Sequence, residues 1–141
     1  MPAHITVLYP FKPLEQIGDD DVSRLTALFA KYAPFDISFA STSRFPTTVW
    51  LVPKPDGPIR ALTGALVRAF PAFLPYGGEF TDPIPHLTVA QGSEAVLDEV
   101  ETALRRRLSP PIHARATHCT LFALGGGRWR AQRTFALGTG I

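Results

Sequence analysis

The chain has 141 residues, of which 45% are hydrophobic and 18% charged, and its formal net charge is +2. This length fits one domain with a hydrophobic core, and the composition excludes a disordered acidic or basic tail protein. The weak positive charge gives no support for duplex DNA as a partner, whereas a small anionic substrate needs no strong overall field.

Cysteine usage and hydropathy predict the compartment. The single cysteine, Cys119, cannot form a disulfide within the chain, which is typical of a reducing compartment. No run of about 18 apolar residues occurs, and the first residues lack the pattern of a signal peptide. We therefore expect a cytoplasmic protein without a membrane segment.

Hydrophobic periodicity predicts alternating strands and helices in the first half of the chain. The predicted elements are, in chain order, a strand over 3–9, a helix over 19–32, strands over 35–40 and 47–52, and a helix over 59–70. Three aspartates open the first helix and Pro34 ends it, while Pro58 suits the start of the second helix. Tyr76-Gly77-Gly78 then predicts a flexible loop.

The second half repeats this order in a shorter form. A strand is predicted over 86–90, and Ser93 can cap a following helix. The buried side of that helix is predicted to carry Val96, Val100, Leu104 and Leu108. An i,i+4 pair of Glu101 and Arg105 is predicted on its solvent side. Strands over 112–124 and 129–137 should flank a turn at 125–127 as a hairpin.

Each half of the chain begins with a His-x-Thr strand, so the two halves form a long and weak repeat. Strands dominate the connections and helices intervene irregularly, which favours an α+β fold with antiparallel sheets over a doubly wound fold. We predict one bilobal domain over residues 1–141, with a pseudo-twofold pair of antiparallel sheets and flanking helices.

The two His-x-Thr motifs are the most informative feature of the sequence. They are His4-Ile5-Thr6-Val7 and His86-Leu87-Thr88-Val89. In a strand, residues two apart project from the same side, so each motif would present an imidazole and a hydroxyl about 7 Å apart. The intervening Ile5 or Leu87 would point into the core and fix the orientation of the strand. One such motif is typical of a surface histidine, whereas two matching motifs favour a paired site.

Two histidines and two hydroxyls around one cleft suit phosphodiester chemistry. A neutral imidazole can take a proton from the attacking water or hydroxyl, and a protonated imidazole can give one to the leaving oxygen. Threonine hydroxyls can donate hydrogen bonds to the non-bridging oxygens as charge develops on them. This scheme requires neither a metal nor another cofactor.

The motifs resemble the two signature strands of the 2H phosphoesterase superfamily, which includes the 2′-5′ RNA ligase-like proteins. The matching segments are Ala3-His4-Ile5-Thr6-Val7-Leu8-Tyr9-Pro10-Phe11 and Pro85-His86-Leu87-Thr88-Val89-Ala90. The Tyr76-Gly77-Gly78 loop is also similar to bacterial members. The order of elements resembles the superfamily over the whole chain, and only the two motifs are specific to the superfamily.

This resemblance implies a bilobal, pseudo-twofold α+β fold. It also implies that His4 and His86 form the acid–base pair and that Thr6 and Thr88 bind the phosphate. Substrates of the superfamily include RNA 2′,3′-cyclic ends, 2′-5′ linkages and cyclic phosphates of ADP-ribose. Membership of the superfamily does not determine which of these substrates is used or whether the reaction is hydrolysis or ligation. It also does not determine which histidine is the acid and which the base.

Other side chains allow both a functional and a structural interpretation. Tyr9 and Phe11 could stack on a base or pack in the core. Arg44, Arg128 and Arg130 could reach a phosphate or remain solvated. His113 and His118 lie five apart, which sends them to opposite faces of a regular strand and disfavours a metal site. Cys119 is expected in the core, and glycines 125–127 form a turn without a phosphate-loop pattern.

The sequence therefore predicts a monomeric, metal-independent phosphodiesterase, or a reversible ligase, of 2′,3′-cyclic or 2′-5′ phosphodiesters. The substrate would be a nucleotide or an RNA end. The alternatives are a non-catalytic RNA-end or nucleotide-binding module that retains the cleft, and a partner-binding domain in which the motifs are only structural.

Overall fold

Helices and antiparallel strands alternate in the computed structural model, which describes residues 1–79 and 82–138. The elements are η1 (Leu14–Gln16), α1 (Asp19–Ala30), β1 (Phe35–Phe45), β2 (Thr48–Lys54), α2 (Gly57–Ala69), η2 (Pro75–Gly78), β3 (Leu87–Gln91), α3 (Glu94–Arg107), β4 (Ile112–Ala116), β5 (His118–Gly125) and β6 (Arg128–Ala136). The predicted α+β fold with antiparallel sheets is confirmed.

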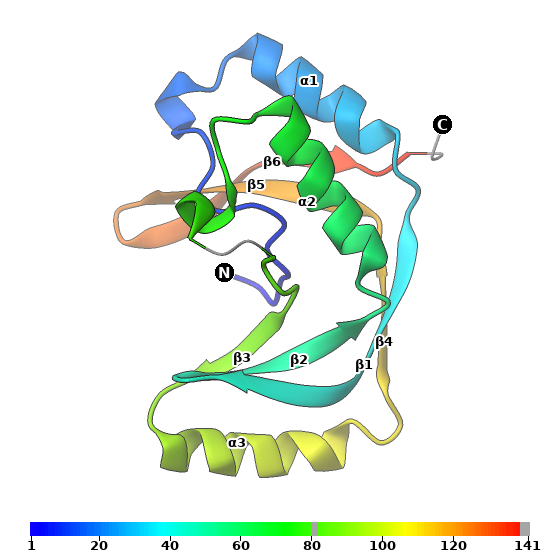
Figure 1. Ribbon diagram of the computed structural model, residues 1–141, viewed down its shortest axis with the longest axis vertical. Helices are drawn as coiled ribbons and strands as arrows, with labels where there is room; N and C mark the ends of the chain where they lie inside the picture. The colour runs from blue at the N-terminus through cyan, green and yellow to red at the C-terminus, as the bar shows by residue number, and fades with distance from the viewer. Residues whose placement is uncertain (80–81, 139–141) are drawn as a thin grey trace.

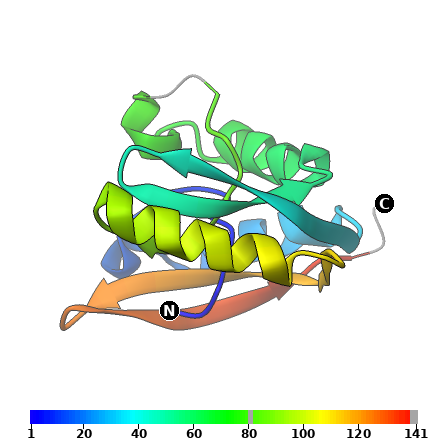
Figure 2. The same cartoon turned by 90° about the horizontal axis from the view of Figure 1, so that it is seen from below.

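The larger sheet has four strands in the order β3-β2-β1-β4, and every neighbouring pair is antiparallel. Helix α3 lies across one face of this sheet (Figures 1 and 2). Strand β2 is buried along most of its length and has β1 and β3 on its two edges. Its register with β3 places Trp50 opposite Thr88 and Leu51 opposite Leu87.

The smaller sheet is the β5–β6 hairpin, and helix α1 packs against β6. Gly126 and Gly127 have φ values of 59° and 75°, which glycine adopts without the steric cost of a side chain. The predicted hairpin turn is therefore confirmed. The single strand predicted over 112–124 is wrong, because β4 pairs with β1 whereas β5 pairs with β6. Before Thr117 the alternating apolar residues are Ile112, Ala114 and Ala116, and after it they begin at Cys119 and Leu121, so the alternation changes phase where the chain changes sheets.

Two clusters of buried side chains form the core. The first joins α1, α2 and the end of the hairpin, and it contains Leu25, Phe29, Leu62, Leu66, Phe70, Phe135 and Leu137. The second joins the four-stranded sheet to the start of α2 and the end of α3, and it contains Ile37, Phe39, Leu51, Ile59 and Leu108. Cys119 packs against the first cluster, as expected, and burial raises the pKa of its thiol to about 11.

Helix α3 is capped as predicted, and its predicted buried side is confirmed at Leu108, which is 5% exposed, and at Leu104, which packs against the second cluster. The Ser93 hydroxyl accepts a hydrogen bond from the Val96 backbone N–H at 3.4 Å. Val96 itself is 44% exposed, whereas Leu97 is 1% exposed. The predicted pair of Glu101 and Arg105 forms at 3.6 Å, but Glu101 is buried rather than on the solvent side. The buried stripe therefore runs through Leu97, Glu101, Leu104 and Leu108, and the prediction is wrong at Val96 and at Glu101, which has polar partners on β1.

The segment over residues 3–9 is not a strand, so that prediction is wrong. Donors from other elements bind two of its carbonyl groups in place of a ladder. The Thr63 hydroxyl of α2 donates to the Val7 carbonyl at 2.6 Å. The Tyr76 backbone N–H of η2 donates to the Tyr9 carbonyl, also at 2.6 Å. Alternation is necessary for a half-buried strand, but pairing also needs a strand alongside.

Candidate active site

His4 lies in the extended N-terminal segment with an exposed side chain. Its Nδ1 lies 2.9 Å from the backbone carbonyl oxygen of Pro2. A carbonyl oxygen can only accept, so Nδ1 carries the hydrogen in this bond. In the neutral ring, Nε2 is therefore the acceptor, available to take a proton from a bound molecule.

His86 directly precedes β3 and makes the same contact. Its Nδ1 lies 2.7 Å from the carbonyl oxygen of Ile84, again two residues earlier in the chain. Two aromatic rings hold the imidazole edge-on, with centroid distances of 5.1 Å to Phe45 and 5.8 Å to Trp50. The backbone and these rings fix the imidazole orientation, and Nε2 is again the free nitrogen.

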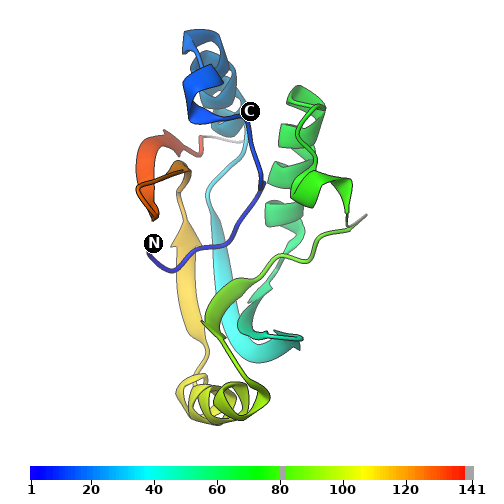
Figure 3. The same cartoon turned by 90° about the vertical axis from the view of Figure 1, so that its left-hand side faces the viewer.

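The two motifs meet at the second core cluster. Ile5 and Leu87, the middle residues of the two His-x-Thr motifs, both pack against it. In Figures 1 and 3 the N-terminal segment runs beside the segment that leads into β3. The predicted inward orientation of both apolar residues is thus confirmed, and the shared contact explains how positions far apart in the sequence come together.

The two threonines occupy different settings. Thr88 is exposed on β3, opposite Trp50 of β2. Since residues two apart on a strand share a face, Thr88 lies on the face of the sheet that also carries the Trp50 ring beside His86. Thr6 is half-buried in the N-terminal segment and lines a cavity of about 580 Å³ beside α2.

The aromatic candidates separate into one core residue and one surface residue. Phe11 packs edge-on against Phe70 and Phe73, at centroid distances of 5.1 and 5.5 Å, so it serves the core. Tyr9 is 47% exposed and lies between Tyr76, at 6.4 Å, and Trp129, at 5.9 Å. Tyr9 therefore remains available to a ligand.

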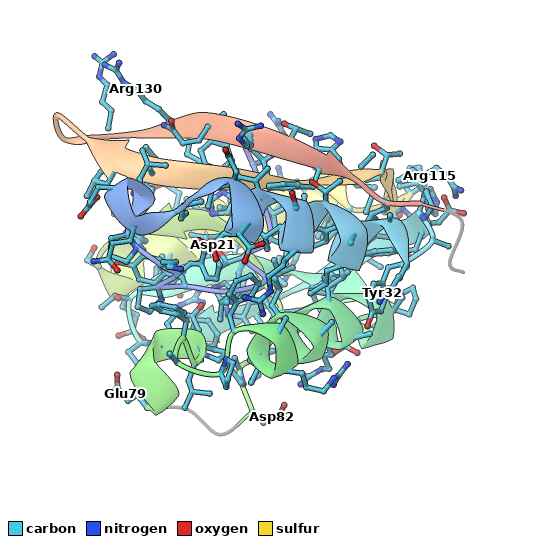
Figure 4. The ribbon with its side chains drawn as sticks, turned by 90° about the horizontal axis from the view of Figure 1, so that it is seen from above. Asp21, Tyr32, Glu79, Asp82, Arg115 and Arg130 are labelled. Carbon is cyan, nitrogen blue, oxygen red and sulfur yellow. The ribbon has the colours of Figure 1, made fainter. Side chains whose placement is uncertain are left out.

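One of the three candidate arginines is engaged in ion pairs, and the other two are exposed. Arg44 binds Asp98 at 2.6 Å and Glu101 at 2.9 Å, which makes it a link between β1 and α3. Arg128 and Arg130 lie on β6 with exposed side chains. Figure 4 shows Arg130 pointing away from the body of the protein.

Sequence reasoning missed the aromatic surroundings of His86 and of Tyr9. Phe45 and Trp50 contact His86, and Tyr76 and Trp129 flank Tyr9. These contacts join residues distant in the sequence, so no local pattern reveals them. Trp50 Nε1 is buried without a hydrogen-bond partner among the described residues.

Metal-binding side chains do not cluster in the described part of the chain. Over residues 1–79 and 82–138, no group of three or more His, Cys, Asp or Glu side chains could hold an ion. His113 pairs with Ser38 of β1, and His118 Nδ1 contacts the Thr117 hydroxyl at 3.0 Å. Within the same residues, no helix is long and apolar enough to cross a membrane.

Comparison with known proteins identifies the family. The sequence profile of the 2'-5' RNA ligase superfamily matches residues 1–128. No curated protein matches the sequence.

Solved structures share the fold at low sequence identity. A crystal structure of E. coli LigT complexed with 3'-AMP has a TM-score of 0.62 and 19% identity, over 98% of this chain and 78% of that one. A crystal structure of a phosphoesterase has a TM-score of 0.58 and 19% identity over the same shares. E. coli LigT complexed with NADP+ has a TM-score of 0.56 and 17% identity, over 98% and 77%. With the profile match over most of its length, the chain belongs to the 2'-5' RNA ligase superfamily.

Proposed function

We propose that this protein is a phosphodiesterase, or a reversible ligase, that acts on 2′,3′-cyclic or 2′-5′ phosphodiesters of nucleotides or RNA ends. The observation that carries the proposal is the matched pair of histidine contacts. His4 and His86 each donate from Nδ1 to the carbonyl two residues earlier, at 2.9 and 2.7 Å, and each keeps Nε2 for a substrate. Such a pair can serve as general base and general acid at one phosphate.

The two histidines would exchange roles between the forward and reverse directions. A neutral imidazole removes the proton of the attacking water or hydroxyl through Nε2. The other, protonated imidazole donates from Nε2 to the departing ribose oxygen. One proton is thus taken up and one is released by the two histidines in each step. The Thr6 and Thr88 hydroxyls would donate to the non-bridging oxygens, where negative charge develops. Every proton transfer in this scheme is made by a side chain of the protein, so it needs no metal ion.

Family and fold support a nucleotide substrate. The chain belongs to the 2'-5' RNA ligase superfamily, and the LigT structures with the same fold are complexes with 3'-AMP and NADP+. We therefore propose a nucleotide or RNA end as the substrate. As expected from the sequence, we further propose that the enzyme is cytoplasmic and monomeric.

A substrate screen tests this function. Nucleoside 2′,3′-cyclic phosphates, 2′-5′ dinucleotides and ADP-ribose cyclic phosphate are incubated with the wild-type protein, with and without EDTA. The His4→Ala protein, prepared in parallel, serves as the blank. Turnover that survives EDTA and is absent from the blank is the expected result. Binding of these compounds without turnover of any would favour a nucleotide-binding module, and turnover that depends on added Mn²⁺ or Zn²⁺ would contradict the two-histidine mechanism.

A further inference from the structure

Charge is divided unevenly along the chain. All 12 acidic residues lie within residues 1–101, together with seven of the 14 basic residues, whereas the other seven basic residues, all of them arginine, lie within 102–141. The overall charge of +2 is therefore the sum of −5 in the first part and +7 in the second. A charge asymmetry of this kind is typical of proteins that bind a polyanion.

The β5–β6 hairpin carries three of these arginines without a compensating carboxylate. Arg128, Arg130 and Arg133 lie on β6 with exposed side chains, and residues 118–136 contain no acidic residue. None of the three arginines forms an ion pair within the part of the chain that the structure describes. Other basic side chains do form ion pairs with carboxylates, namely Lys12, Arg44, Arg60, Arg105 and Arg115. The hairpin therefore presents positive charge that the protein itself leaves unbalanced.

The spacing of the hairpin arginines suits the backbone of a nucleic acid strand. Arg128 and Arg130 are two residues apart on β6, so their side chains leave the same side of the strand about 7 Å apart. Figure 4 shows Arg130 pointing away from the body of the protein, where a long ligand can reach it. Guanidinium groups bind phosphate through parallel N–H donors, so each arginine can hold a different phosphate of an extended strand.

Exposed apolar side chains lie at the same end of the hairpin. Trp129 lies between Arg128 and Arg130 in the sequence and is 37% exposed, and its cross-strand partner Leu124 is 60% exposed. Proteins that bind single strands combine a cationic surface with aromatic rings on which bases stack. A free inorganic anion has no use for such a ring, so the combination favours a single-stranded nucleic acid.

The hairpin also lies next to the first His-x-Thr motif. The centroid of the Trp129 ring is 5.9 Å from that of Tyr9, and Tyr9 follows His4 by five residues in the same N-terminal segment. A strand whose end is bound by the histidines can therefore continue over the hairpin.

We propose that the β5–β6 hairpin is a surface for single-stranded RNA, on which Arg128, Arg130 and Arg133 bind backbone phosphates beyond the reacting nucleotide. The inference rests on the proposed function and deepens it, because it names an RNA strand rather than a mononucleotide as the preferred substrate. These phosphates are remote from the reacting one, so loss of the arginines should weaken binding of a strand and leave the reaction of a mononucleotide unchanged.

Two triple variants with the same change of charge test this surface. The hairpin variant carries Arg128→Gln, Arg130→Gln and Arg133→Gln. The helix variant is the matched control and carries the same replacement in the last turn of α3, at Arg105, Arg106 and Arg107. In Figure 1, α3 lies below the larger sheet and the hairpin lies above it. Because both variants lose three positive charges, a difference between them reports the location of the charge and not the net charge.

The activity test compares kcat/KM for an RNA of about ten nucleotides with a 2′,3′-cyclic end with that for adenosine 2′,3′-cyclic phosphate. We expect the wild-type protein and the helix variant to favour the RNA about tenfold or more at low salt, because phosphate contacts release counterions. The hairpin variant should bring this ratio close to one while it keeps the wild-type kcat/KM on the mononucleotide. A wild-type ratio in the hairpin variant, or an equal fall in both variants, would overturn the inference.

A binding measurement separates this inference from the proposed function, because it needs no turnover. Fluorescence anisotropy follows the binding of a labelled RNA of the same length that ends in a 3′-phosphate, over a range of salt concentrations. Each phosphate contact on a single strand contributes about 0.7 to the slope of log Kd against log salt concentration. The hairpin variant should therefore show a slope about 2 smaller than the wild-type protein, and the helix variant should keep the wild-type slope.

Trp129→Leu tests the stacking part and serves if the hairpin variant does not fold. It should weaken RNA binding about tenfold at an unchanged salt slope, because stacking on a ring releases no counterions.

If the wild-type protein turns over no phosphodiester, the proposed activity fails, and the RNA surface still stands on the lowered slope of the hairpin variant. The surface fails if the hairpin variant keeps the wild-type slope, or if the helix variant loses as much.

Discussion

The Nδ1 contacts of His4 and His86 predict how the reaction depends on pH. Each imidazole keeps its backbone bond in both charge states, because Nδ1 carries a hydrogen in either. One ring must be neutral and the other protonated for the proposed step. The kcat/KM of the wild-type protein should therefore give a bell-shaped pH profile on a 2′,3′-cyclic substrate. A profile that rises to a plateau without an alkaline limb would exclude a histidine acid.

The threonine hydroxyls can be tested through their effect on kcat. If Thr88 stabilises charge in the transition state, Thr88→Ala should lower kcat by up to about 10²–10³-fold. Thr88→Ser, which keeps the hydroxyl, should recover most of that loss, and Thr6 should behave in the same way. If the hydroxyl binds only the ground-state phosphate, steady-state kinetics will show a raised KM at an unchanged kcat instead.

At the scale of single elements, helix α3 offers a direct test of which face is buried. Leu97 is 1% exposed, so Leu97→Ala should lower the free energy of unfolding by about 2–5 kcal/mol through loss of contacts and a remaining cavity. Val96 is 44% exposed, so Val96→Ala should stay within about 0.5 kcal/mol of wild type. Urea denaturation measures both values, and equal losses would contradict the orientation of the helix.

Periodicity predicted most elements because the residues that decide them are close in the sequence. The carboxylates at 19–21 and Pro34 bound α1, and Ser93 caps α3. The predictions fail where contacts with residues distant in the sequence determine the local structure. Residues 3–9 alternate like a strand but bind α2 and η2 instead, and the chain changes sheets at Thr117 because β4 finds its partner in β1 and β5 in β6. Val96 and Leu97 are both apolar, so only the packing partner selects between them.

At the scale of the whole molecule, a buried carboxylate joins α3 to β1. Glu101 accepts hydrogen bonds from the Thr42 hydroxyl at 2.5 Å and from Arg44 Nε at 3.0 Å. These bonds, that from Thr42 foremost, hold the pKa of Glu101 below its ordinary value of about 4.5. A lowered folded pKa contributes stability that is complete above the ordinary value and is lost as the pH falls through the lowered one.

Glu101→Gln should therefore reduce the free energy of unfolding at pH 7 by about 1 kcal/mol, allowing for solvent screening of the pair. The difference from wild type should shrink as the pH falls below about 4.5, because the protonated carboxyl resembles the amide. Asp36→Asn, which removes an exposed pair with Arg115, should change little at either pH. Urea denaturation at pH 7 and pH 3 measures the effect, and a difference that does not depend on pH would rule out this linkage.

Of the candidate site, only the side chains of the two His-x-Thr motifs were predicted from the sequence pattern. The spacing in His4-Ile5-Thr6 and His86-Leu87-Thr88 indicated which side chain of each motif faces the core, and both apolar residues do pack there. The rings of Phe45 and Trp50 around His86, and of Tyr76 and Trp129 around Tyr9, depend on how the two sheets and α2 assemble. That assembly comes from non-local contacts, which periodicity does not contain.

The turnover number of the His4→Ala protein tests the two-histidine mechanism most directly. His4 is exposed in an N-terminal segment without strand pairing, so a merely structural histidine there could be removed without effect. His113→Ala, at another exposed histidine on β4, is the matched control and should retain wild-type kcat on a validated 2′,3′-cyclic or 2′-5′ substrate. The two-histidine mechanism predicts that His4→Ala lowers kcat by about 10²-fold or more. Near wild-type turnover of His4→Ala would contradict it, even if His86→Ala were inactive.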